Sequence, residues 1–324
     1  EDLPLEVVVE IEANPDLYAG AKIVSQRRRV YSAGRLAAHL LGHLGPVEGE
    51  ELTGRPVDDT YHPDDRVGRM GLERQYENLL RGRRGVAIEL SDRQGRLLSS
   101  HRRTEPGIGR DLVTTIDSRL QRAAQELLAS ALERRAIGQT DAEPAGGAIV
   151  VIDVSDGAVL AAASAPDFDP NVFATGDDAG RIEALFSDPA DPIFDRTCKM
   201  AIPPGSVFKV VSAAALLESS TIGPGETFFC QGYLHSPDRQ RCTIYKHQGI
   251  GHGDVTLSDA LCVSCNVYFF HQAERLGWMP LVDWSLAFGL AQPTGVDLPD
   301  EAAGMVPTPV TIRELEGHGW RPGD

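Results

Sequence analysis

The chain has 324 residues, which is long enough for two domains, and 42% of them are hydrophobic, which is enough for sizeable cores. With 47 acidic residues against 31 basic ones, the net charge at pH 7 is −16. This balance argues against nucleic acid or anionic lipid as a general partner, because both bind basic surfaces. No apolar run reaches the length of a membrane span, and the sequence shows no signal-peptide pattern.

Residues 1 to about 110 predict an α+β region built from short elements. Runs of β-branched residues indicate strands, and Asp92-Arg93-Gln94-Gly95 is typical of a hairpin turn. A glycine after a periodic apolar run indicates the end of a helix. The expected elements are strands at 5–11 and 22–25, helices at 32–42 and 70–81, a loop at 47–65, and a hairpin of 86–90 with 97–99.

Residues 111–163 predict a strand, one long helix, a linker and a second hairpin. Ser118 and Gln121 form a capping-box pattern at the start of the helix, and apolar residues follow at helical spacing. Ser155-Asp156-Gly157 indicates a tight turn between two strands that are apolar on both faces, which predicts an inner hairpin of a buried sheet. In order, we expect a strand at 111–117, a helix from 118, a linker at 136–146, and strands at 148–154 and 158–163.

The most informative stretch is a Pro-Pro-Gly turn that ends at Gly205, because an apolar helix follows it at once. Ser206 falls in the first turn of that helix, where free N–H groups and the positive dipole end favour a developing anion. Lys209 is three residues on, so its amine lies on the same helix face as the hydroxyl. A lysine in so apolar a helix is expected to be largely buried. A buried amine loses its proton more easily and can activate the serine.

A second polar constellation lies at the junction of two predicted helices. One helix is expected to begin at 256–259, to break at Ser264-Cys265-Asn266, and to resume over 267–276. A hydroxyl and an amide one residue apart on a short loop can point into one cleft while the middle side chain points away. Ser264 could relay a proton, and Asn266 could hold a substrate amide or the lysine. Taken alone, the triplet is more typical of an ordinary polar cap.

Together these motifs resemble a known family. Ser206-x-x-Lys209 followed downstream by Ser264-x-Asn266 resembles the penicilloyl-serine transferases, which are the penicillin-binding proteins and the serine β-lactamases. Several other segments resemble class B penicillin-binding proteins, and the last two resemble the elongation type, penicillin-binding protein 2: 29–42, 71–77, 112–121, 147–164, 251–253 and 264–270.

The resemblance implies an α+β fold. An N-terminal pedestal domain over residues 1–145 would precede the first part of a penicillin-binding/β-lactamase-like transpeptidase domain, residues 146–324, in which helices pack on an antiparallel sheet. It also implies a peptidoglycan D,D-transpeptidase of cell-wall elongation. Ser206 would attack a D-alanine carbonyl of a stem peptide, with Lys209 as the base, Ser264 as the proton shuttle and Asn266 as a substrate holder. The N–H of Ser206 would be one oxyanion donor.

The same resemblance implies the partners and the location. The expected partners are peptidoglycan stem peptides, β-lactam antibiotics and a SEDS-family glycosyltransferase, with no nucleic acid. The expected location is the periplasmic side of the inner membrane, with an anchor upstream of residue 1. One family motif, Lys-Thr-Gly or Lys-Ser-Gly, is absent from the sequence. We expect its strand to belong to a longer parent protein, since it would line one wall of the cleft and complete the oxyanion hole.

The five cysteines all lie in the second half of the chain, and four of them accompany two histidines, His247 and His252, between and within the two motifs. Cysteine and histidine are the ligands that zinc prefers, although the spacing is not that of a zinc ribbon. The resemblance implies a structural zinc ion, with no cofactor needed for catalysis. Its expected ligands are Cys230, Cys242, His252 and Cys265. With zinc bound, Cys265 would face away from the cleft and pin the loop that carries Ser264.

Alternatives remain open for the metal and for the function. Cys230 and Cys242 could instead form a disulfide in an oxidising compartment, or could be buried thiols. His247 is the reserve ligand, and Cys198 and Cys262 are expected in the core. For the function, the rivals are a hydrolase, meaning a β-lactamase or D,D-carboxypeptidase, and a non-catalytic cell-wall assembly scaffold. The missing third motif is the best support for the scaffold.

Overall fold

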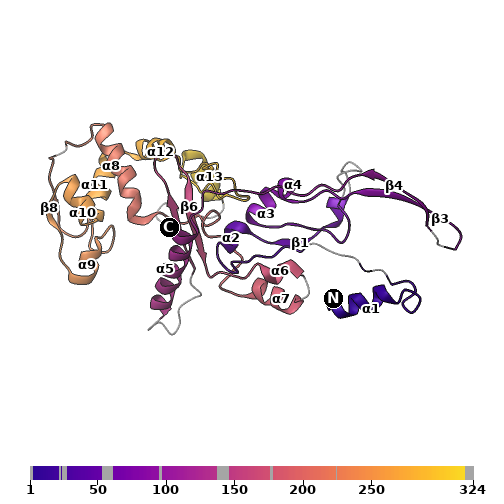
Figure 1. Ribbon diagram of the computed structural model, residues 1–324. Coiled ribbons are helices and arrows are strands. Elements are labelled where there is room, and N and C mark those ends of the chain that lie inside the picture. Colours follow the sequence, from indigo (N-terminus) through magenta and orange to yellow (C-terminus); the bar gives the residue numbers. More distant parts are fainter. Residues whose placement is uncertain are drawn as a thin grey trace. The chain divides into compact units, whose positions relative to one another are not determined.

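The computed structural model describes residues 3–21, 23, 28–52, 61–94, 97–136, 146–175, 178–223 and 225–317. The chain divides into two compact units, Glu1–Thr197 and Cys198–Asp324. Figure 1 labels the helices and strands of both units. The domain boundary expected at residue 145 stays a prediction. Within the described ranges, every helix is too short or too polar to cross a membrane.

The first element is a helix where the sequence predicted a strand. α1 spans Leu5–Ala13, follows Pro4 and buries none of its residues. The prediction over 5–11 was wrong because it weighed the β-branched residues alone. A strand needs a neighbour for its backbone N–H and C=O groups, and none of the described strands pairs with this segment, whereas a helix satisfies those groups internally. The strand expected at 22–25 lies almost entirely outside the described residues.

The next elements are shorter than the sequence predicted. Only the last turn of the helix expected at 32–42 forms, and it ends at Gly42 as predicted. The helix expected at 70–81 breaks in two at Tyr76. These elements are α2 (Ala38–Leu41), β1 (Leu44–Pro46), the 3-10 helix η1 (Gly49–Leu52), β2 (Arg66–Gly68), α3 (Gly71–Gln75) and α4 (Glu77–Leu80), with β1 and β2 antiparallel.

The first predicted hairpin is confirmed and is longer than expected. β3 (Val86–Ser91) pairs antiparallel with β4 (Leu97–Thr104), with Ile88 opposite His101 and Leu90 opposite Ser99. Every residue of β3 is exposed.

The long helix α5 (Ser118–Ala136) forms as predicted, but its cap differs. Asp117 accepts hydrogen bonds from the side chain of Arg119 and from the backbone N–H groups of Arg119 and Leu120. Together these bonds lower the pKa of Asp117 to about 2. Gln121 does not complete a capping box. Its side chain instead bonds both the N–H and the carbonyl of Ala162 on the neighbouring strand.

The second hairpin is also confirmed. β5 (Gly147–Ile152) pairs antiparallel with β6 (Val159–Ala165), and Gly157 in the turn has φ +81°. α5 packs on this pair, and Ala124 and Leu128 bury against the small residues of β6. The sheet has two strands and is buried less than expected, because Val150 and Ile152 of β5 are about half exposed. No strand forms at 111–117, where Thr115 reaches the carbonyl of Val159 through its side chain instead of its backbone.

Two helices that the sequence analysis did not predict lie in the polar stretch after this hairpin. They are α6 (Asn171–Thr175) and α7 (Ala179–Ser187). Around them Phe168 and Phe173 pack with Met70 in a core that includes two buried histidines. His43 stacks on Phe173 with ring centroids 3.9 Å apart, and His39 meets Phe168 edge to face.

The second unit is mostly helical, and its core lies beneath the two motifs. α8 packs against α10, α11 and α12. Leu216, Val267 and Tyr268 are fully buried in the core that these helices share with three cysteines. The elements are η3 (Gly205–Phe208), α8 (Lys209–Glu218), β7 (Phe228–Cys230), α9 (Thr243–Gln248), β8 (Gly253–Val255), α10 (Leu257–Cys262), α11 (Asn266–Leu276), α12 (Trp278–Ala287) and α13 (Pro309–Gly317), with β7 and β8 antiparallel.

Candidate active site

Ser206 is presented at a sharp corner of the backbone. Gly205 has φ +62°, a conformation that residues with a side chain rarely adopt, and it opens the 3-10 helix η3. Ser206 is the second residue of η3 and its side chain is exposed. The turn therefore holds the hydroxyl outward, at the start of a helix, where a substrate can reach it.

Lys209 begins α8 and points its amine at the second motif. Its Nζ donates to the carbonyl of Ser264 at 2.8 Å, to Oγ of Ser264 at 2.9 Å, and to Oδ1 of Asn266 at 2.6 Å. An ammonium has three N–H donors, so these three acceptors account for all of them. The amine is half-buried, and burial lowers the pKa of Lys209 below its ordinary value, while the nearby Cys265 and Cys242 oppose that shift.

The loop that carries Ser264 is fixed from both sides. α10 opens with a capping box between Thr256 and Asp259, and α11 begins at Asn266. Between the two helices, Ser264 adopts φ +52°, which is uncommon for a residue with a side chain, and the N–H of Cys265 bonds the carbonyl of Ala260. Left-handed backbone at a non-glycine residue costs about 1–2 kcal/mol and is common at functional sites.

The two serines and the lysine form a continuous hydrogen-bonded chain. Oγ of Ser264 donates to Oγ of Ser206 at 3.0 Å and accepts from Nζ of Lys209. Among the hydrogen bonds of the described residues, none joins Lys209 directly to Ser206. Ser264 therefore lies between the nucleophile candidate and the base candidate.

The amide of Asn266 is oriented by a backbone carbonyl. Its Nδ2 donates to the carbonyl of Arg241 at 3.2 Å, which turns Oδ1 toward Lys209. The four predicted site residues thus converge in one place, although the two motifs are more than fifty residues apart in the sequence.

The four predicted metal ligands also converge. The donor atoms of Cys230, Cys242, His252 and Cys265 all lie within 4.8 Å of one another. Sγ of Cys230 is 3.6 Å from Sγ of Cys242 and 3.6 Å from Nδ1 of His252, and Sγ of Cys242 is 3.6 Å from Sγ of Cys265. A tetrahedral zinc site, with Zn–S of about 2.3 Å and Zn–N of about 2.0 Å, places its donor atoms about 3.5–3.8 Å apart. The donor set and its spacing therefore fit zinc.

The other cysteine predictions have mixed outcomes. Cys230 and Cys242 are free thiols in the structure, well beyond the S–S bond length of about 2.05 Å. Cys198 is half-buried, and Cys262 is exposed, so its placement in the core was wrong. Leu257 and Ala260 form the buried face of α10, and Cys262, two residues after Ala260, falls on the other face.

The thiol cluster is joined directly to the start of α11. Sγ of Cys242 accepts a hydrogen bond from the N–H of Val267, and Sγ of Cys265 accepts one from the N–H of Tyr268, both at 3.4 Å. These are first-turn N–H groups, which have no acceptor within their own helix. The cluster thus fixes the helix end that carries Asn266.

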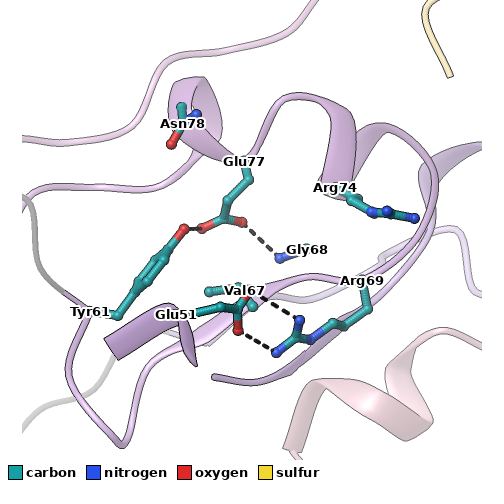
Figure 2. A pocket seen from close by; sticks show the side chains of 8 residues that line it. All are labelled: Glu51, Tyr61, Val67, Gly68, Arg69, Arg74, Glu77 and Asn78. Carbon is teal, nitrogen blue, oxygen red and sulfur yellow. Dashed lines mark hydrogen bonds and ion pairs between the residues drawn. The ribbon is translucent and has the colours of Figure 1, made fainter. Parts of the chain in front are cut away.

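The first unit holds a separate cavity of about 380 Å³. Figure 2 shows that Arg69 pairs with Glu51 on one wall, while Glu77 accepts hydrogen bonds from the N–H of Gly68 and the hydroxyl of Tyr61 on another. It contains no serine–lysine pair. A smaller apolar hollow of about 130 Å³ in the second unit lies against Phe208, which directly precedes Lys209.

Comparison with known families agrees with this geometry. A model described as the penicillin-binding protein transpeptidase domain matches residues 147–319, more than half of the chain. The chain belongs to the penicillin-binding proteins. A second model, the penicillin-binding protein dimerisation domain, matches residues 1–114. The family predicted from the motifs is confirmed, and so is the order of an N-terminal domain followed by a transpeptidase domain.

Individual relatives of this penicillin-binding protein carry consistent names. The "Peptidoglycan D,D-transpeptidase MrdA" of Acinetobacter baumannii is 32% identical over 95% of this chain and 43% of its own length. A complex of penicillin-binding protein 2 and MreC from Helicobacter pylori contains a chain that is 26% identical, with a TM-score of 0.80, covering 99% of this chain and 57% of that one.

A third match comes from a peptidoglycan synthase complex that coordinates polymerization and crosslinking. It is 32% identical, with a TM-score of 0.76, covering 99% of this chain and 54% of that one. This penicillin-binding protein spans about half the length of the curated relatives that it matches.

Two features of the site escaped the sequence analysis. The carbonyl of Arg241 orients Asn266, and no side-chain pattern signals a backbone acceptor. The ring of Phe269 lies beside the Lys209 amine, with Nζ 5.6 Å from the ring centroid. Its position three residues after Asn266 on a helix was a usable signal, because such residues share a face.

Proposed function

We propose that this penicillin-binding protein is part of a peptidoglycan D,D-transpeptidase that cross-links stem peptides during cell-wall elongation. The observation that carries the proposal is the hydrogen-bonded chain from Ser206 through Ser264 to Lys209, with Asn266 on the same amine. A serine hydroxyl becomes a nucleophile only when a base removes its proton, and this arrangement supplies one.

The first step is acylation of Ser206. Lys209 enters the step as a free amine, which its lowered pKa favours. Hydroxyl hydrogens rotate, so Ser206 can donate to Ser264 while Ser264 donates to Lys209. Oγ of Ser206 bonds to the carbonyl carbon of the penultimate D-alanine, its proton moves to Ser264, and the proton of Ser264 moves to Lys209. The N–H of Ser206 serves as one donor to the oxyanion.

The second step releases the terminal D-alanine. The C–N bond breaks, Ser264 protonates the leaving amine, and Lys209 returns a proton to Ser264. An amine from a neighbouring stem peptide then attacks the acyl-enzyme by the reverse route, and Ser206 regains its proton. In this scheme Lys209 exchanges protons with the leaving amine and with the incoming amine through Ser264. Ser264 can relay these protons because its hydroxyl contacts both Lys209 and Ser206.

The proposal extends to ligands, partners and location. β-Lactams acylate Ser206 as substrate mimics. The first unit serves as a docking surface for a SEDS-family glycosyltransferase on the periplasmic side of the inner membrane. The peptidoglycan synthase complex and the MreC complex among the related structures support a cell-wall assembly partner. An anchor before residue 1 stays a prediction.

We also propose a structural zinc ion held by Cys230, Cys242, His252 and Cys265, whose donor atoms lie within 4.8 Å of one another, with three of the distances at 3.6 Å. When bound, zinc supplies a cross-link between four segments and no chemistry of acyl transfer. The role of the thiols is positional: Cys242 and Cys265 accept the first N–H groups of α11 and so hold Asn266 in place.

Labelling with a fluorescent penicillin tests the function in the longest natural form of the protein. Stable labelling that is lost in Ser206→Ala supports the transpeptidase. Labelling that decays within minutes favours a hydrolase, and absence of labelling favours a non-catalytic scaffold. Ser212→Ala is the matched control, because Ser212 lies in α8 and its hydroxyl bonds only the carbonyl of Phe208.

A further inference from the structure

The amine of Lys209 is bounded by an aromatic ring as well as by oxygen atoms. Nζ lies 5.6 Å from the ring centroid of Phe269, within the range at which a cation is attracted to a ring face. Phe269 is 7% exposed and meets Tyr268 edge to face, with ring centroids 5.5 Å apart. The ring is therefore held in one place by packing.

The ring belongs to the same short segment that binds the amine. Asn266 and Phe269 are three residues apart on α11 and share a face, and Ser264 precedes them on the same loop. No described carboxylate forms an ion pair with Lys209. Its charged form is thus surrounded by neutral oxygen atoms and by the ring.

An environment of neutral oxygen atoms and one aromatic ring suits a lysine that must gain and lose a proton during the reaction. A carboxylate partner would stabilise the ammonium strongly and keep the amine protonated. An aliphatic wall would exclude water and leave the ammonium that forms during acylation with less stabilisation. An aromatic face excludes water and also attracts the cation, at an energy smaller than that of an ion pair.

We propose that Phe269 is a positioning residue for acyl transfer: its ring face holds the Lys209 amine against Ser264 and stabilises the ammonium that forms when Lys209 receives the proton of Ser206. This inference rests on the proposed function and adds a residue to it. Phe269 acts through Lys209 and does not touch the reacting atoms.

The test replaces Phe269 alone with phenylalanines that carry one, two or three fluorine atoms. Fluorination weakens the attraction of the ring for a cation and leaves its shape nearly unchanged. The same series at Phe270, which follows it on α11 and is 37% exposed, is the matched control. We expect the acylation rate of fluorescent penicillin to fall stepwise at position 269, by about three- to thirty-fold in total, and to stay constant at position 270.

A second readout reports the contact itself. Carbon-13 labelling of the lysine ε-methylene groups gives a spectrum in which Lys209→Arg assigns the signal of Lys209. We expect the ε protons of Lys209 to be shifted by the ring, and Phe269→Leu to remove that shift.

Two results overturn the inference: an acylation rate that is the same across the fluorinated series at position 269, or a Lys209 signal that does not change in Phe269→Leu. Equal melting temperatures across the series show that folding is unaffected. If unmodified protein shows no labelling that depends on Ser206, the proposed function fails. The lysine spectrum still tests the contact between Phe269 and Lys209 in that case, because it needs no catalysis.

Discussion

Asn266 accepts a hydrogen bond from Lys209 at 2.6 Å, the shortest of the three bonds that the lysine amine makes. The two residues begin different helices, α8 and α11, and are 57 positions apart. This contact joins the two sequence motifs into one site.

Replacing Asn266 with alanine removes one acceptor from Lys209 and frees the amine to turn away from Ser264. Because hydrogen bonds to charged groups contribute about 1.5–3 kcal/mol, we expect acylation by a fluorescent penicillin to slow by about ten- to a hundredfold. Stopped-flow labelling measures the rate, and the melting temperature checks the fold. An acylation rate within twofold of the unmodified protein would show that the contact has no role in the chemistry.

Removing a ligand of the thiol cluster tests the zinc site. We expect protein purified without added metal to hold one zinc ion per chain. Cys230→Ser should lose it and melt at lower temperature, because structural zinc contributes directly to folding. Cys262→Ser is the matched control, since Cys262 is exposed and lies outside the cluster. Elemental analysis and thiol titration give the answer. A metal-free protein with two fewer free thiols than expected would mean a Cys230–Cys242 disulfide.

The two buried histidines of the first unit predict a loss of stability in mild acid. His39 and His43 are 3% and 7% exposed, and burial lowers the pKa of each. In the unfolded chain a histidine titrates near pH 6.5, so between that pH and the lower folded value the unfolded state binds more protons. The stabilisation that comes from keeping these two histidines neutral should be fully present above about pH 6.5. The free energy of unfolding should decrease as the pH falls below that value.

Urea unfolding at pH 7.5 and pH 5.5 measures this effect. Replacing both His39 and His43 with glutamine should lower stability at both pH values and reduce the difference between them. An equal pH dependence in the double variant and the unmodified protein would contradict the assignment to these two histidines.

Glu73 predicts a loss of stability when a buried carboxylate with two partners is removed. It is 6% exposed, pairs with Arg29 at 2.8 Å and accepts a hydrogen bond from the hydroxyl of Tyr31. Glu73→Ala removes the ion pair and the hydrogen bond together with the packing of a buried side chain, and should destabilise the first unit by about 1–3 kcal/mol. Chemical denaturation measures the change, with the exposed Glu183→Ala expected to stay within about 0.5 kcal/mol. A similar small effect at position 73 would show that water replaces the pair.

The candidate site was predictable because its chemistry is local in the sequence. Ser206 and Lys209 lie within one helical turn, and Ser264 and Asn266 flank a helix start, so spacing alone placed each pair. For the thiol cluster, residue type supplied six candidate ligands, and the resemblance selected four of them. That the pairs meet depends on how α8 and α11 pack, and the resemblance supplied that expectation, not the spacing.

The errors have physical causes. Residues 5–11 have β-branched side chains, but none of the described strands pairs with them, and a helix satisfies their backbone groups internally. α6 and α7 are short helices in a polar stretch, where periodicity is weak. The contact of Phe269 with Lys209 was not predicted, because it depends on how α8 and α11 pack, although Phe269 shares a helix face with Asn266.

The identity of the acylated residue tests the central claim most directly. After reaction of the longest natural form with a β-lactam, peptide mapping by mass spectrometry should find the adduct on the peptide that contains Ser206. The amount of adduct should fall sharply in Ser264→Ala, which interrupts the hydrogen-bonded chain to Lys209. An adduct on another residue, or an undiminished adduct on Ser206 in the Ser264 variant, would contradict the proposed route of the proton.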